Sequence, residues 1–223
     1  MARKPSTARP LRSKPSSARR AALRLWIVPT LVIAGLFTGA TGLRTLSAHR
    51  HQTQIGGPYS LIDSTNRPTT QARFAGRQTL IYFGYTHCLD VCPLTLATVA
   101  QAYTLLPPDM LRPVPVFITL DPERDHPEDV GIYTRRFSPE IIGLTGTTAQ
   151  INAVAKAFHV TSHVTLDPAA DRDGGDEEKG DYRIDHSSVL YLMDGQNRLQ
   201  AILPADSSPA VVAHDLAPYL AKR

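Results

Sequence analysis

The two cysteines of this 223-residue chain, Cys88 and Cys92, lie four positions apart in the stretch YFGYTHCLDVCPLTLATVA, residues 82–100. At that spacing, one turn of a helix would place both thiols on the same face. They come where a helix is expected to begin, and the positive end of the helix dipole favours the thiolate form. A thiolate attacks disulfides and binds soft metals, so a structural disulfide, a redox couple and a metal site are all open interpretations.

The spacing of the pair bears on these three interpretations. A thioredoxin-type redox pair has two intervening residues, whereas the three found here leave room for a metal between the sulfurs. Two thiolates joined by an imidazole would form a donor set that selects Cu(I) and also holds Cu(II). A structural disulfide closing so short a loop would restrict the unfolded chain very little, although an oxidising compartment favours disulfides in general.

One of the eight histidines, His186, is the candidate third ligand. It opens the stretch DHSSVLYL at the start of a strong apolar strand, and a thioredoxin layout would return that position beside the start of the first long helix. A structural role for His186 stays open from the residues alone. The other histidines are predicted to be surface or structural residues, including His87, whose ring should point away from the cysteine beside it: His49, His51, His87, His126, His159, His163 and His214.

The elements that must position these residues follow from hydrophobic periodicity. Strands are predicted at residues 59–62, which start a hairpin with a turn at 64–67, and at 79–85, 113–120, 141–146, 159–166, 182–194 and 199–203. Helices are predicted from Pro93 in a first turn through Leu106, and at 126–137, 148–158 and 208–223. The order βαβ followed by ββα predicts an α/β, thioredoxin-like fold with an extra N-terminal β-hairpin. Residues 167–181, rich in acids and without apolar periodicity, are expected to form a mobile loop.

The N-terminal region predicts a membrane anchor. Residues 1–24 carry eight Lys or Arg and no acid, which indicates a basic cytoplasmic tail. Residues 25–43 are uncharged and, at about 1.5 Å per residue, reach about 28 Å, enough for one transmembrane helix. A cleaved signal peptide is the alternative. Residues 44–56 are expected to be a linker and residues 57–223 the thioredoxin-like domain.

The charge of the chain is uneven, and this excludes one class of function. Its pI of 9.2 reflects the basic tail, because the remaining residues hold 16 basic against 20 acidic side chains. The predicted domain is therefore mildly acidic, and no nucleic-acid-binding surface is expected.

Four motifs resemble, in order and spacing, those of the Sco/SenC copper proteins: YFGYTHCLDVCP, VFITLDPERDHPE, IIGLTGT and YRIDHSSVLYL. That family consists of membrane-anchored, thioredoxin-fold proteins of mitochondria and bacterial inner membranes, and the resemblance covers residues 57–223. It implies that Cys88, Cys92 and His186 bind copper. One departure is visible, because the family commonly has proline where this chain has Leu89.

The resemblance also implies a role and a place in the cell. The role is delivery of copper to the CuA site of cytochrome c oxidase, with the copper-site subunit and another copper donor protein as partners. The expected location is the bacterial inner membrane with the soluble domain in the periplasm, or alternatively the mitochondrial inner membrane facing the intermembrane space.

Other functions use the same sulfurs and stay open. A thiol–disulfide reductase would use Cys88 and Cys92 as a redox-active pair acting on the cysteines of the oxidase copper site. A sensor of copper or of redox state is a further alternative. A peroxidase is disfavoured, because peroxiredoxins carry Thr where this chain has Leu89. A metallochaperone rather than an enzyme is the favoured interpretation.

Overall fold

The computed structural model describes residues 55–166 and 182–221, which belong to the compact unit Gln54–Arg223. The predicted basic tail, transmembrane anchor, most of the linker and the acidic loop lie outside the described residues. Among the helices that are described, none has the length and apolar character needed to cross a membrane. The strands are β1 Ser60–Asp63, β2 Pro68–Thr70, β3 Thr79–Gly84, β4 Val114–Thr119, β5 Ile142–Thr145, β6 Ser162–Leu166, β7 Tyr182–His186, β8 Val189–Met193 and β9 Leu199–Pro204. The helices are α2 Val91–Leu105, α3 Pro127–Arg135, α4 Thr148–Ala157 and α5 Pro209–Leu216, with short 3-10 turns at Gln71–Phe74 and Ala217–Tyr219.

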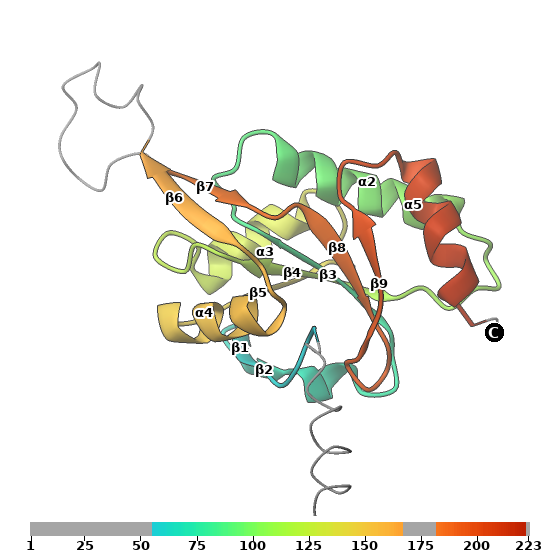
Figure 1. Ribbon diagram of the computed structural model, residues 1–223, viewed down its shortest axis with the longest axis horizontal. Helices are drawn as coiled ribbons and strands as arrows, with labels where there is room; N and C mark the ends of the chain where they lie inside the picture. Colours follow the sequence, from blue (N-terminus) through green and yellow to red (C-terminus); the bar gives the residue numbers. More distant parts are fainter. Residues whose placement is uncertain (1–54, 167–181, 222–223) are drawn as a thin grey trace, which may run out of the picture. The chain divides into compact units, whose positions relative to one another are not determined.

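The described strands form a mixed seven-stranded sheet in the order β2-β1-β5-β4-β3-β8-β9 (Figure 1). β3, β4 and β5 are parallel neighbours, whereas β1 and β8 join them in antiparallel register. The predicted order, βαβ followed by ββα, is confirmed by β3-α2-β4 and β8-β9-α5. The predicted N-terminal hairpin is confirmed as β1 and β2, which extend the sheet beyond β5.

The two central strands are apolar on both faces because helices cover both sides of the sheet. Every residue of β3 and β4 is buried. Leu80 and Tyr82 contribute to a core cluster with residues of α2, α3 and α5. Ile81 and Phe83 point the other way, into a second cluster with residues of α4. A continuous apolar run is typical of such a doubly covered strand, and this rigid centre carries the loop that contains the cysteines.

The prediction of one long strand over residues 182–194 is wrong. The chain forms β7 and β8 instead, with a break at Ser187 and Ser188. β7 pairs with β6 in a separate two-stranded sheet, whereas β8 pairs with β3 in the main sheet. The two halves of the predicted strand therefore belong to different sheets, and His186 is the last residue of β7.

Two other predicted elements are shorter than expected. The strand predicted at 159–166 begins at Ser162, because His159 has a φ of 56°, which lies in the left-handed region and not in the extended one. The helix predicted at 208–223 ends at Leu216 and continues as the 3-10 turn Ala217–Tyr219. Pro218 lies in that turn, and its missing N–H interrupts α-helical hydrogen bonding.

A buried carboxylate fixes the N-terminal hairpin. Asp63 is 3% exposed and accepts hydrogen bonds from the backbone N–H and hydroxyl of Thr65, at 2.9 and 2.6 Å, and from Arg73 at 2.7 Å. Burial alone raises the pKa of Asp63, but these hydrogen bonds, with one from Arg67, outweigh burial and hold the pKa below its ordinary value.

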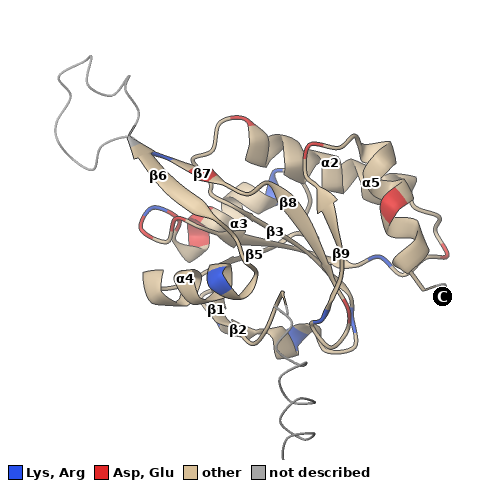
Figure 2. Ribbon diagram, in the orientation of Figure 1, with Lys and Arg blue, Asp and Glu red and all other residues tan. Residues whose placement is uncertain are grey.

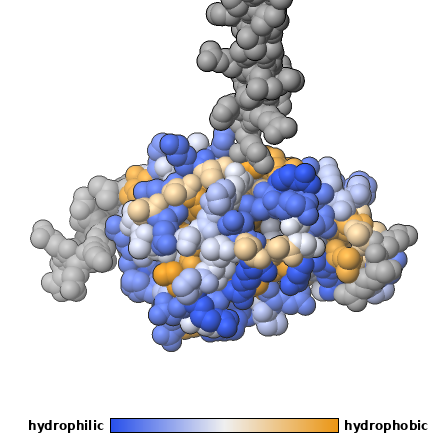
Figure 3. Space-filling view, turned by 90° about the horizontal axis from the view of Figure 1, so that it is seen from below, coloured by the Kyte–Doolittle hydropathy of each residue, from blue (hydrophilic) through white to orange (hydrophobic). Residues whose placement is uncertain are grey.

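The face of the molecule seen from below is mostly hydrophilic, with scattered apolar patches (Figure 3).

Candidate metal centre

The two cysteines lie at the junction between β3 and α2. α2 begins at Val91, so Cys92 is in its first turn and Pro93 follows there as predicted, where a missing N–H costs little. Cys88 precedes the helix, so the prediction of two thiols on one helical face is wrong. The helix start instead turns its backbone toward Cys88, because the N–H of Cys92 lies 3.4 Å from the Cys88 Sγ. A free N–H at a helix start is suited to hold a thiolate.

His186 lies beside this pair, in the place predicted from the layout of the fold. Its Nε2 is 3.6 Å from the Sγ of Cys92. Its Nδ1 lies 3.1 Å from the backbone oxygen of Ser187, and since a carbonyl can only accept, that contact places the ring proton on Nδ1. Nε2 then keeps a free lone pair on the side of the ring where the Cys92 sulfur lies. This is the way in which backbone contacts orient histidine ligands.

Aromatic rings hold the imidazole in place. The rings of Tyr82 and Tyr85 both meet the His186 ring edge-on, at centroid distances of 6.1 and 6.3 Å. The hydroxyl of Tyr82 is buried beside the Cys92 thiol and the hydroxyls of Thr95 and Ser188. Burial raises the pKa of Tyr82, so this hydroxyl stays neutral and keeps its proton to donate.

The electrostatics divide the two thiols into different roles. The S–H of Cys92, directed at Cys88, lowers the pKa of Cys88 to about 5, although burial opposes it, and the backbone N–H groups of Cys92 and Asp90 act in the same direction. The same contact raises the pKa of Cys92, and its burial raises it further. Both cysteines are free thiols, Cys92 buried and Cys88 half-buried. Cys88 is therefore the nucleophilic thiolate. Cys92 keeps its proton until it binds a metal or is oxidised.

This division predicts a distinct alkylation profile for the metal-free protein. The rate of Cys88 modification by iodoacetamide should rise with pH through about 5 and level off above that, because the thiolate is the reacting form. Cys92 should stay unmodified in the folded protein. Mass spectrometry of the two alkylated positions between about pH 4 and about pH 10 measures both rates. Denatured protein is the control, in which both thiols should titrate at about 8.5. A midpoint near that value for Cys88 in the folded protein would contradict the prediction.

The surroundings of the cysteine pair are open and apolar. Leu89, Val91 and Leu94 are 88%, 43% and 62% exposed. α2 contains no charged residue, which Figure 2 shows as a helix without red or blue. A cleft of about 490 Å³ opens beside Cys88, between the cysteine loop and the start of β7. Because Leu89 points into solvent, its departure from the motif of the resembling family removes no ligand from the site.

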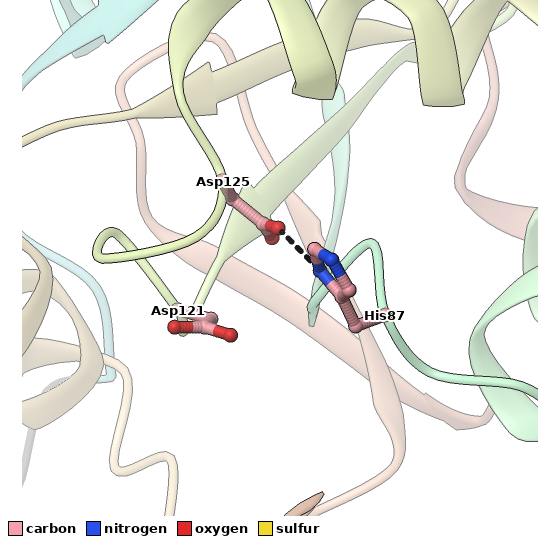
Figure 4. A group of neighbouring side chains, drawn as sticks. All are labelled: His87, Asp121 and Asp125. Atoms are coloured by element: carbon pink, nitrogen blue, oxygen red, sulfur yellow. Dashed lines mark ion pairs between the residues drawn. The ribbon is translucent and has the colours of Figure 1, made fainter. Parts of the chain in front are cut away.

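A second group of potential ligands, His87, Asp121 and Asp125, lies close by (Figure 4). Nδ1 of His87 is 3.4 Å from a carboxylate oxygen of Asp125, so its ring is directed at that carboxylate. Both carboxylates are already occupied by protein donors, among them the guanidinium of Arg124 on Asp121. An adjacent cation and occupied oxygens disfavour a metal here. No role was predicted for these two aspartates, although both stand in the motif VFITLDPERDHPE.

The remaining described histidines agree with their predicted surface roles. These side chains are all exposed: His126, His159, His163 and His214. His49 and His51 lie outside the described residues.

Comparison with known proteins assigns the chain to a family. The family model described as SCO1/SenC matches residues 47–221. The chain belongs to the SCO1/SenC family. The mitochondrial SCO1 homologue 1 of Arabidopsis thaliana is 41% identical over 140 residues, covering 62% of this chain and 39% of that protein. The mitochondrial SCO1 homologue of Mus musculus is 31% identical over 212 residues, covering 92% of this chain and 72% of that protein.

The solved structures of Sco proteins share this fold. The crystal structure of Arabidopsis thaliana ScoI with copper bound is 34% identical, with a TM-score of 0.65, and covers 74% of this chain and 96% of that one. A more distant Sco protein, BsSco, is described as having a disulfide switch and as a member of the Sco family of cytochrome c oxidase assembly proteins. At 17% identity and a TM-score of 0.54 its likeness shows the fold alone.

Proposed function

We propose that this Sco protein is a copper chaperone, which carries copper on Cys88, Cys92 and His186 and delivers it to the CuA site of cytochrome c oxidase. The observation that carries the proposal is the approach of His186 Nε2 to within 3.6 Å of Cys92 Sγ, beside a Cys88 sulfur that already contacts the Cys92 N–H. Two sulfurs and an imidazole nitrogen suit Cu(I) and also hold Cu(II). The copper bound in the Arabidopsis thaliana ScoI structure supports the metal, and the assembly role described for the family supports the client.

Delivery would proceed by ligand exchange. Both cysteines must be reduced and deprotonated to bind copper, so binding releases a proton from Cys92. A thiolate or imidazole of the client then attaches to the ion before one of the chaperone's ligands leaves, and copper is never free. The half-buried Cys88 gives an incoming ligand access, and the exposed apolar side chains of Leu89 and Leu94 provide a surface on which a client can dock.

The proposed location is the bacterial inner membrane, with one transmembrane helix and the domain in the periplasm. The alternative is the mitochondrial inner membrane facing the intermembrane space. Relatives come from mitochondria and from bacteria, since they include a mitochondrial SCO1 homologue of Mus musculus and an SCO2-like protein of Rickettsia felis. The copper-site subunit of the oxidase and a copper donor protein are the proposed partners.

The low pKa of Cys88 favours a second candidate, a thiol–disulfide reductase of the client's copper-site cysteines. The Cys88 thiolate would attack one sulfur of the client's disulfide and form a mixed disulfide, releasing the other sulfur as a thiolate. Cys92, after losing its proton, would then displace the client's remaining sulfur. The client leaves as a dithiol, and this protein ends with a Cys88–Cys92 disulfide.

A transfer experiment separates the two functions. The reduced full-length protein is loaded with Cu(I), desalted, and mixed with a reduced, metal-free copper-site domain of a cytochrome c oxidase. We expect about one copper ion per chain to be retained and then to move to the client domain, as metal analysis of the separated proteins would show. Failure to retain copper, together with stoichiometric reduction of an oxidised client, would instead establish the reductase. Retention without transfer would contradict delivery.

A further inference from the structure

The segment that joins β4 to α3 carries two buried aspartates close to the candidate metal centre. Asp121 is 2% exposed and Asp125 is fully buried. Aspartate is almost never fully buried unless it is paired, because a carboxylate loses its hydration on burial. The cost must be offset by specific partners, and the partners of these two residues lie on the two halves of the site.

Asp125 holds the loop that carries the cysteines. Its carboxylate accepts hydrogen bonds from the backbone N–H of Thr86 at 2.9 Å and from the Thr86 hydroxyl at 2.5 Å. It also accepts one from the hydroxyl of Thr119, the last residue of β4, at 2.5 Å. Thr86 stands two residues before Cys88, so these charge-assisted bonds fix the direction in which the chain leaves β3 and approaches the first thiol.

Asp121 holds the strand that carries the histidine. Its carboxylate accepts hydrogen bonds from the Tyr182 hydroxyl at 2.6 Å and from Arg124 Nε at 2.5 Å. Arg124 in turn donates to the backbone oxygen of Tyr182 at 3.1 Å, and its guanidinium lies 3.6 Å from the centre of the Tyr182 ring. Tyr182 is the first residue of β7 and His186 is the last. Three contacts of different kinds therefore hold the N-terminal end of the strand that carries the histidine.

β7 needs such an anchor because it is not a strand of the main sheet. In the part of the chain that the structure describes, β7 pairs with β6 alone. Ile184 packs into the core cluster that also contains Cys92, and Tyr182 packs against the same cluster. A second fixed point at Tyr182 is needed to set the direction in which the strand carries His186 toward Cys92.

We propose that residues 121–125 form a brace that positions the two halves of the metal centre relative to each other. Asp125 fixes the cysteine loop through Thr86, and Asp121 with Arg124 fixes the histidine strand through Tyr182. Because the two aspartates are four residues apart in one segment, the separation between sulfur and imidazole is set by a short piece of backbone. All of these are positioning residues. The expected effect on copper binding rests on the proposed function.

A purely structural role gives a different expectation, and Asp63 is the matched control. Asp63 is also a buried aspartate, 3% exposed, with hydroxyl, backbone and guanidinium donors, but it belongs to the N-terminal hairpin. If buried aspartates here only stabilise the domain, then Asp63→Asn, Asp121→Asn and Asp125→Asn should all affect the site alike.

Hydrogen–deuterium exchange on the metal-free, full-length protein tests the brace without copper. Asp125→Asn and Thr86→Val should accelerate exchange in the cysteine loop, at residues 86–88, by at least about fivefold beyond any change in global unfolding. Asp121→Asn and Tyr182→Phe should do the same in β7. Asp63→Asn should accelerate exchange in residues 60–70 alone. Thr86→Val and Tyr182→Phe keep the test decisive if an aspartate variant fails to fold.

Copper affinity, measured by competition with a chromophoric Cu(I) chelator, tests the consequence for the site. Each brace variant should weaken binding by about tenfold, the size found for groups that orient metal ligands, whereas Asp63→Asn should not. Tyr182→Phe should cause no further loss in a His186→Ala background, because it acts through that histidine, whereas Asp125→Asn should keep its full effect there.

The failures of the two proposals are distinguishable. If the parent binds no copper, the proposed function fails, while the exchange measurements still decide the brace. If exchange rises uniformly across the domain in every variant, or if Tyr182→Phe and His186→Ala weaken copper binding additively, the brace is overturned.

Discussion

Replacing Cys92 with serine should cost the protein its copper, with a fall in Cu(I) affinity of more than about a hundredfold. Loss of a group that only orients a ligand costs about tenfold to a hundredfold, so loss of a ligand should exceed that range. A serine hydroxyl is a hard donor that Cu(I) does not favour. Cys92 is fully buried at the start of α2, so no other side chain can take its place without moving the helix. Competition with a chromophoric chelator measures the affinity.

A second variant, Cys92→Ala, tests the effect of Cys92 on Cys88 in the absence of metal. The S–H of Cys92 is the largest influence that lowers the pKa of Cys88, and alanine, unlike serine, puts no donor in its place, so the alkylation midpoint of Cys88 should move upward from about 5. Ala102→Ser is the matched control for Cys92→Ser, because it also places a buried hydroxyl on α2 but does so away from the thiols. Copper retention equal to that of the parent in Cys92→Ser would refute the proposed ligand set.

Most of the sheet could be predicted because its strands carry their own signal. β3 and β4 are unbroken apolar runs, which are typical of strands covered on both faces. The helix α4 was predicted from its apolar periodicity and α3 from the residue types at its two ends, both to within two residues at either end. Both kinds of pattern are local, since they record which residues face a core and nothing about which strand is the neighbour.

The division between β7 and β8 could not be predicted, because it depends on pairing. Residues 182–194 read as one extended segment, and Ser187 and Ser188 give no strong break signal. The chain changes sheets there because β8 has β3 as its antiparallel neighbour and β7 has β6. The position of His186 was nevertheless predicted, because both layouts return it to the start of α2.

The candidate site divides in the same way. The spacing of Cys88 and Cys92 is a local feature, and it was found from the sequence. The hydrogen bonds from Asp125 to the cysteine loop were not predicted, because the partner Thr86 is 39 positions away. The sequence pattern also does not reveal that a carboxylate within a polar segment is buried. A clue did exist in the two aspartates of DPERD, which follow directly on a buried strand, where side chains of neighbouring strand ends meet.

Replacing His186 with alanine is the second substitution expected to have a large effect, and it separates the two candidate functions. The change removes the imidazole 3.6 Å from Cys92 Sγ, so copper affinity should fall by about a hundredfold or more. Thiol chemistry should change little, because His186 is the last of the influences that lower the pKa of Cys88. The alkylation rate at neutral pH should therefore stay within about threefold of the parent's.

His87→Ala is the matched control for this prediction. His87 is next to Cys88 in the sequence, but its ring is directed at Asp125 (Figure 4), and we expect the variant to retain copper. Chelator competition gives the affinities, and reduction of an oxidised client domain gives the exchange rates for both variants. A chaperone requires that His186→Ala lose copper and keep thiol exchange. If His186→Ala holds copper as the parent does, the imidazole is no ligand, and the two thiols function as a reductase pair for which the histidine is dispensable.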